Sequence, residues 1–299
     1  MVPMIEAKEV GIQKKSLRAD LRPRAWLAFW IVLSLVVLGA GYAGRSRREP
    51  QASTEIFKGV MYGCDRLDRT EEGSGLVHWV QIDLAAPGIE LYVTPLDRSA
   101  VATGWQYRLR RVEDVVRSEQ LAVAVNGSYF SSKFDWLLRV PGDFAKGLDT
   151  VVSDHVVSHI WERTYLLWFS DQLTPSLSIS KPPSAAELGL AKWGIGTIEV
   201  GLHDGKVWPG NGRAPDSRTA VAIDRPRKLL FLAVGEYISP RLLLQKLAGL
   251  GAKDGMLLDG GGSTSMAIGQ GAVGLAPGVL YGGWRPVATH FGVRAQPKF

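Results

Sequence analysis

The chain has 299 residues, 46% of them hydrophobic and 21% charged, a composition typical of a globular protein with a sizeable core. Much of the formal net charge of +6 lies in a basic stretch before residue 50. No run of Lys and Arg with interleaved aromatic residues follows that stretch, which argues against nucleic-acid binding.

Residues 25–44 form an uncharged segment between a basic tail, residues 1–24, and a polar linker, residues 45–55. The segment has the ~20 residues that a helix needs to cross a bilayer. Lys and Arg are more numerous before it than after it, so the positive-inside rule predicts a single-pass membrane protein with a cytoplasmic N-terminus and an extracytoplasmic C-terminal domain. A cleaved signal peptide is the alternative, because Gly41-Tyr42-Ala43 resembles a cleavage site, and the protein would then be secreted.

The numbers and positions of cysteine and histidine residues argue against disulfides and a zinc site. Cys64 is the only cysteine, so the chain has no intramolecular disulfide. His155 and His159 lack a third residue placed to complete a zinc site, and Asp149 and Asp154 are interpreted as turn residues. The sequence therefore predicts no metal site and no cofactor, and leaves open whether a divalent cation assists.

From residue 56 onward the chain alternates strand-like segments with turns, and it has no internal repeat. In chain order the expected strands are 76–84, 89–93, 121–125, 151–152, 155–160, 165–169, 196–200, 205–208, 220–224, 229–234, 256–258, 266–268 and 286–293. Three turns predict hairpins: Ala86-Pro87-Gly88, His203-Asp204-Gly205 and Asp224 to Lys228.

Two helices are expected between these strands. One covers residues 112–119. The other begins with Ser239 as N-cap and Pro240 in the first turn, presents a leucine-rich face, and ends at Gly249 or Gly251.

Two of the buried strands end in a polar residue followed by glycine. Strand 121–125 runs into Asn126-Gly127, and strand 256–258 runs into the stretch 259–265, Asp-Gly-Gly-Gly-Ser-Thr-Ser. Three consecutive glycines cost backbone entropy, and their N–H groups can form a concave anion site. Asn126 could bond a substrate hydroxyl or hold a neighbouring loop. The alternative for both stretches is a plain turn without a ligand.

Arg218 precedes the strand 220–224 in the segment Ser217-Arg218-Thr219. A guanidinium group suits bidentate contact with phosphate oxygens. The alternative is a solvated arginine at the start of a strand.

Four segments in this order resemble the phosphodiester glycosidase family, namely Asn126–Phe130, Ser217–Asp224, Leu258–Met266 and Arg285–Val287. The resemblance extends over most of residues 56–295. It implies a catalytic domain over 56–296 that hydrolyses the bond between a sugar's anomeric carbon and a phosphodiester, here at the cell envelope. The implied fold is mixed α/β (α+β), with a curved, largely antiparallel sheet flanked by helices, preceded in this chain by the predicted transmembrane helix.

The resemblance also suggests roles for the polar residues of these segments. The expected catalytic residues are Asp259, Arg218, Asn126 and His290, and the expected substrate-binding residues are Gly127, Thr219, Gly260, Gly261, Gly262, Ser263, Thr264 and Arg285. Asp259 would stabilise an oxocarbenium-like centre, position water or attack, and Arg218 with the glycine amides would hold phosphate oxygens. His290 would transfer a proton or be a buried strand histidine.

The chain departs from the family pattern at Ser128, at Gly235-Glu236 and at Ser263-Thr264-Ser265, which bears on substrate choice more than on reaction class. Two other functions stay open from sequence. One is a non-catalytic, membrane-tethered binding module for anionic cell-envelope glycans. The other is a serine hydrolase using Ser263, although no Gly-x-Ser-x-Gly elbow surrounds that serine.

Overall fold

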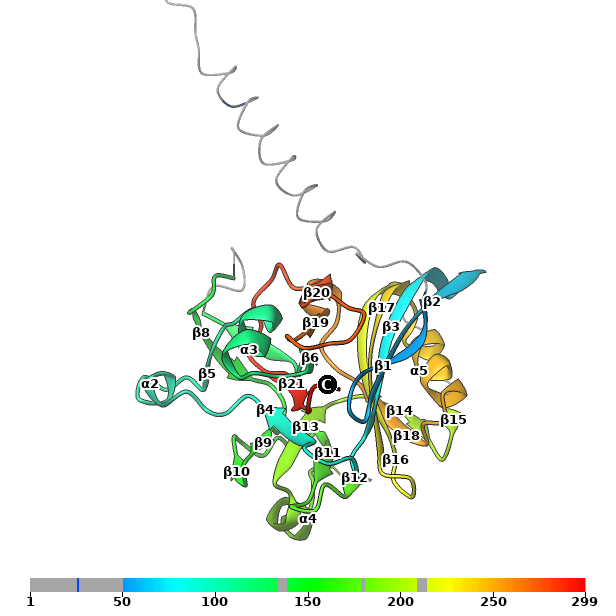
Figure 1. Cartoon of the computed structure of the whole chain (residues 1–299). Coiled ribbons are helices and arrows are strands. Elements are labelled where there is room, and N and C mark those ends of the chain that lie inside the picture. The colour runs from blue at the N-terminus through cyan, green and yellow to red at the C-terminus, as the bar shows by residue number, and fades with distance from the viewer. Residues whose placement is uncertain (1–25, 27–50, 134–138, 179–180, 209–213, 299) are drawn as a thin grey trace, which may run out of the picture. The chain divides into compact units, whose positions relative to one another are not determined.

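A computed structural model describes Trp26 and residues 51–133, 139–178, 181–208 and 214–298 (Figure 1). The chain divides into two compact units, Met1–Tyr42 and Ala43–Phe299. The expected basic tail and the apolar segment, Trp26 excepted, lie outside the described residues. Within the described ranges, no helix combines the length and the apolarity needed to cross a membrane.

The unit Ala43–Phe299 consists mainly of strands, and every strand pair among its described residues is antiparallel. The largest sheet has the order β1 (Gln51–Phe57), β2 (Val60–Thr70), β3 (Gly73–Asp83), β17 (Leu229–Ile238), β16 (Asp216–Asp224), β18 (Asp254–Leu257), β14 (Val200–His203) and β15 (Lys206–Val207). We call it the eight-stranded sheet.

The other described strands form three smaller sheets. The β6 sheet has the order β20 (Gly278–Gly282), β19 (Ser265–Ile268), β6 (Val123–Asn126), β21 (His290–Arg294) and β4 (Glu90–Val93). A second five-stranded sheet has the order β10 (Val156–Val157), β9 (Val152–Ser153), β13 (Trp193–Thr197), β11 (Tyr165–Phe169) and β12 (Pro175–Leu177). The smallest sheet joins β5 (Tyr107–Arg108), β8 (Phe144–Gly147) and β7 (Phe130–Ser132).

The main core joins the eight-stranded sheet and the β6 sheet, and it also includes Leu167, Phe169 and Ile195 of the second five-stranded sheet. Along β17, Leu230 and Leu232 belong to this core, whereas Phe231 and Ala233 belong to a second cluster on the outer face. This alternation follows from the two-residue period of a strand, because both faces of β17 are covered.

Helices cover the outer faces of the two sheets (Figure 1). Helix α5 (Pro240–Gly249) packs Leu243, Leu244 and Leu247 in the same outer cluster as Phe231 of β17. Helix α3 (Val112–Ser118) packs in a cluster with Ala124 and Ala267 of the β6 sheet. The result is a four-layer α–β–β–α arrangement, to which α2 (Arg98–Val101), α4 (Ala185–Leu190) and the 3₁₀ turn η1 (Gly261–Ser263) are added as short elements.

Several sequence-based expectations are confirmed. Ser239 caps α5, because its hydroxyl accepts the Leu242 N–H at 3.1 Å, and Pro240 occupies the first turn. The turns His203–Gly205 and Asp224–Lys228 close the hairpins β14–β15 and β16–β17. The largely antiparallel strand direction is also correct.

Three expectations need correction. The described strands form four sheets and not one curved sheet. Strands β3 and β4 do not form a hairpin, because β3 pairs with β2 and β17 while β4 pairs with β21. The expected linker ends earlier than residue 55, because Gln51–Phe57 pairs with β2 as an edge strand.

Candidate active site

Asn126, the last residue of β6, is fully buried and joins three segments. Its Nδ2 donates to the backbone oxygen of Asp259 at 2.7 Å, and its Oδ1 accepts from the Thr219 hydroxyl at 2.7 Å and from the Ser265 N–H at 3.0 Å. Both ends of the amide are therefore used within the protein. The geometry favours the role of holding neighbouring loops over the expected role of orienting substrate.

Gly127 and Thr219 complete this junction. The Gly127 carbonyl accepts the Asp259 N–H at 3.1 Å, and a Cβ atom at Gly127 would lie 2.5 Å from the Thr289 hydroxyl oxygen. Thr219 is 1% exposed, with its hydroxyl on Asn126. Both residues therefore support the backbone at Asp259 from inside the protein. Their contacts do not suggest the expected role in substrate binding.

The glycine loop, residues 259–265, uses part of its own hydrogen-bonding capacity. The Gly260 N–H donates to the Asp259 carboxylate at 3.0 Å, and the Ser263 N–H donates to the Gly260 carbonyl at 3.2 Å. Gly261 has a φ of +57°, a conformation that favours glycine. Within the part of the chain that the structure describes, the N–H groups of Gly261 and Gly262 donate to no acceptor. Of the amides of Gly260 to Ser263, only the two adjacent ones of Gly261 and Gly262 are therefore available to an anion.

The Asp259 side chain is half-buried at the end of β18. Burial raises the pKa of its carboxyl group, while a hydrogen bond from the Ser263 hydroxyl, the charge of Arg139, the Gly260 N–H and the charge of Arg285 each lower it. The arrangement supplies a carboxylate that is desolvated but kept within a positive field.

The Ser263 side chain is hydrogen-bonded to the Asp259 carboxylate. Its hydroxyl bonds Asp259, and its oxygen accepts from Arg139 Nη1 at 3.4 Å. No histidine ring among the described residues contacts Ser263, so the contacts give no support to a serine nucleophile.

Two polar atoms at the loop are buried and have no hydrogen-bond partner among the residues that the structure describes. These are Arg218 Nε and the hydroxyl of Thr264, which is 2% exposed. Arg218 also donates from Nη2 to the Ala214 carbonyl at 2.7 Å, and its Nη1 would lie 3.5 Å from a Cβ atom built on Gly260. An unsatisfied buried polar atom costs about 1–3 kcal/mol, and a bound ligand that supplies the missing partner is one explanation for such an atom.

Two more guanidinium groups lie at the loop. Arg139 is half-buried against the Phe130 ring, 4.3 Å from its centroid, and Arg285 Nη1 would lie 2.9 Å from a Cβ atom at Gly262. Arg285 was expected from the sequence. Arg139 was not, because it stands in an irregular stretch that carries no motif.

A second carboxyl group, that of Asp149, feels the charge of Asp259. Asp149 is almost completely buried and accepts hydrogen bonds from the Tyr129 N–H at 3.0 Å and from the Thr164 hydroxyl at 3.4 Å. Burial is the main cause that raises its pKa, and the charge of Asp259 adds to it. The two hydrogen bonds act in the opposite direction, and the pKa that results is about 7. The interpretation of Asp149 as a plain turn residue is therefore incomplete.

His290 does not fit the expected role in proton transfer. The ring is fully buried, with Nε2 donating to the Arg110 carbonyl at 3.1 Å and Nδ1 accepting from the Thr94 hydroxyl at 3.0 Å. Burial lowers its pKa to about 3. A neutral ring with both nitrogens occupied is a structural histidine of β21.

No group of three His, Cys, Asp or Glu side chains within the described ranges could hold a metal ion.

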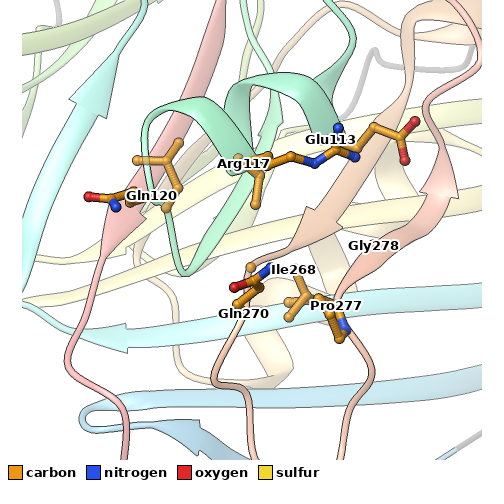
Figure 2. A pocket seen from close by; sticks show the side chains of 10 residues that line it. Glu113, Arg117, Gln120, Ile268, Gln270, Pro277 and Gly278 are labelled. Atoms are coloured by element: carbon orange, nitrogen blue, oxygen red, sulfur yellow. The ribbon is translucent and has the colours of Figure 1, made fainter.

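A cavity of about 520 Å³ lies away from the candidate site, between α3 and the segment joining β19 to β20. Figure 2 shows Glu113 and Arg117 on one side of it and Gln270 and Pro277 on the other. None of the expected site residues lines this cavity.

The sequence model of the phosphodiester glycosidase family matches residues 119–294, more than half of the chain. The chain belongs to the phosphodiester glycosidase family. The matched range contains every expected site residue and also Arg139 and Asp149. No curated protein sequence matches the chain.

Solved structures show the same fold at low sequence identity. The catalytic domain of zebrafish N-acetylglucosamine-1-phosphodiester alpha-N-acetylglucosaminidase, auto-inhibited by its pro-peptide, is similar with a TM-score of 0.57 and 15% identity, over 83% of this chain and 89% of that chain. A hypothetical protein from Synechocystis has a TM-score of 0.50 and 15% identity, over 80% of this phosphodiester glycosidase family member and 62% of that chain.

Proposed function

We propose that this family member hydrolyses the bond between the anomeric carbon of a sugar and a phosphodiester. The observation that carries the proposal is the position of Asp259. Its half-buried carboxylate is adjacent to two amides of its own loop that have no acceptor among the described residues, and it lies within the field of Arg139 and Arg285. Water would add to the anomeric carbon, and the phosphorylated partner would leave as a phosphomonoester.

The phosphate half of the substrate fits the positive side of the site. Among the described residues, no acceptor takes the N–H groups of Gly261 and Gly262, and Arg218 lies beside Gly260 with its Nε unpaired. A phosphate needs little protonation to leave, so stabilising its charge is the larger part of the catalysis. Backbone amides and a guanidinium group provide that stabilisation.

The sugar half fits Asp259. A glycosidic transition state carries positive charge near the anomeric carbon, and an ionised carboxylate stabilises it, attacks it or orients water toward it. Ser263 and Arg139 oppose the effect of burial and favour the ionised form of Asp259. This division of labour needs no histidine.

We place the activity outside the cytoplasm, at the cell envelope. The support is the apolar segment 25–44 with its flanking charges, read from the sequence. Cys64 is buried and is the only cysteine, so no disulfide can form within the chain in an oxidising compartment. The expected substrate is a sugar phosphate carried by an envelope component.

The test uses the full chain in detergent with methyl diesters of glucose-1-phosphate, mannose-1-phosphate and N-acetylglucosamine-1-phosphate. Release of free sugar and methyl phosphate is expected from at least one diester. Asp259→Asn should lower kcat about 100-fold or more. Asp114→Asn, an exposed carboxylate of α3, is the matched control and should leave kcat unchanged.

The competing function is the non-catalytic binding module for anionic glycans. It predicts saturable binding of the same diesters, with no sugar released over long incubation. That result would refute the proposed hydrolase.

A further inference from the structure

Asp149 is a deeply buried carboxyl group whose described partners are all neutral. It is 1% exposed and follows β8, and within the described ranges no Lys, Arg or His forms an ion pair with it. Its hydrogen-bond partners are the neutral Tyr129 amide and Thr164 hydroxyl. A buried charge without a counter-charge is costly, so such a group takes up a proton instead.

The contacts of Asp149 lead directly to Asp259. Asp149 holds the Tyr129 N–H at one end of the turn 126–129, and at the other end Asn126 and Gly127 hold the backbone of Asp259. The position of Asp259 therefore depends on a turn that Asp149 anchors.

The groups that face Asp149 come from three segments. They are the Tyr129 amide from the turn after β6, the Thr164 hydroxyl before β11 and the charged Asp259 of the glycine loop. Asp259 is the more favourably placed for ionisation, since Arg139 and Arg285 act on it. Two nearby carboxyl groups in unlike surroundings take different protonation states, one ionised and one neutral.

We propose that Asp149 is a positioning residue that works in its neutral form, anchoring the turn beneath Asp259 and setting the alkaline limit of the activity. The inference rests on the proposed function, because Asp259 is taken as the reacting carboxylate. When Asp149 loses its proton, a second negative charge is buried next to Asp259, and the turn is expected to shift to hydrate it.

The neutral carboxyl group has a close mimic. In Asp149→Asn the side-chain oxygen can accept from Tyr129 and the NH₂ group can donate to the Thr164 hydroxyl, but the side chain cannot ionise. Asp149→Ala removes the acceptor as well. Comparing the two variants distinguishes the effect of the hydrogen bond to Tyr129 from the effect of losing the proton.

The first measurement is kcat/KM of the full chain on the cleaved diester between about pH 5 and pH 9. Wild type should decline about tenfold per pH unit above neutrality, whereas Asp149→Asn should lack this decline, and Asp149→Ala should be at least about tenfold less active than Asp149→Asn at every pH. The proposal is overturned if Asp149→Asn keeps the wild-type decline, or if it loses as much activity as Asp149→Ala throughout.

The second measurement does not need turnover. The pKa of folded Asp149, about 7, lies above the ordinary 3.8, so the folded state holds an extra proton between these values and stability falls as pH rises through them. In urea unfolding, Asp149→Asn should gain on wild type steadily over this window and hold the gain above it. A constant difference between the two proteins would overturn the neutral form of Asp149. The pH-dependent gain without any sugar release would instead refute the proposed function alone.

Discussion

Asn126 Nδ2 donates to the backbone oxygen of Asp259 at 2.7 Å, across 133 residues of sequence. The same amide binds Thr219 of β16 and Ser265 of β19 through its oxygen. One buried side chain therefore fixes the place where the eight-stranded sheet, the β6 sheet and the glycine loop meet. The candidate site is built at that junction.

Replacing Asn126 should lower the stability of the fold, because its side chain holds three segments together. Asn126→Ala leaves the Asp259 carbonyl, the Thr219 hydroxyl and the Ser265 N–H without their partner, and each unsatisfied buried group costs about 1–3 kcal/mol. We expect a loss of at least about 3 kcal/mol in the free energy of unfolding, measured in urea. Thr219→Val removes one of these bonds at similar shape and should cost about 1 kcal/mol. Equal losses in the two variants would contradict the role of Asn126 as the junction.

A methyl group at Gly262 should disturb activity more than stability. Its Cβ would lie 2.9 Å from Arg285 Nη1, the far end of a flexible side chain, so Arg285 is expected to move and the fold to persist. A displacement of this kind should lower kcat/KM roughly 10- to 100-fold. The control is Gly249→Ala in α5, where nothing lies within 4 Å of the added carbon. That change should raise stability by about 0.5–1 kcal/mol and leave kcat/KM unchanged.

Arg218 should matter for anion binding. Its Nε lacks a partner among the described residues, and the side chain lies beside Gly260. Inorganic phosphate is expected to inhibit diester cleavage competitively, and Arg218→Ala should raise its inhibition constant at least about tenfold, or ~1.4 kcal/mol. Arg117→Ala, an exposed arginine of α3, should not change this constant. An unchanged constant in Arg218→Ala would place the anion elsewhere.

His290 should affect acid stability and not the pH dependence of catalysis. Its folded pKa of about 3 lies below the ordinary 6.5, so the unfolded state binds a proton that the folded state excludes, and stability falls as pH drops through this window. At about 1.4 kcal/mol per unit, the loss amounts to several kcal/mol. His290→Gln should be destabilised at neutral pH yet lose less than wild type on acidification. If His290→Gln instead shifts the pH profile of kcat, the histidine takes part in proton transfer after all.

The strand exits could be predicted from the sequence because buried strands leave a clear pattern. The runs before Asn126 and Asp259 are apolar, and the polar residue marks the point where each strand meets the site. The same reasoning failed for β3 and β4. Both strands contribute to one core from opposite sheets, so their alternation cannot reveal that they are not partners.

Asp149 and Arg139 could not be predicted, for a related reason. Both stand in irregular chain between short strands, and tertiary contacts alone bring them to Asp259. For His290 the sequence left two roles open. The choice depends on Thr94 and the Arg110 carbonyl, which lie 196 and 180 residues away in the chain.

The most direct test of the central claim is the bond that breaks. Cleavage of the diester by the full chain in ¹⁸O-labelled water, followed by mass spectrometry of both products, assigns the attacked atom. Attack at the anomeric carbon places ¹⁸O in the sugar and none in the methyl phosphate, and Asp259→Asn should abolish that labelling. Label in the phosphate would contradict a glycosidase and show attack at phosphorus.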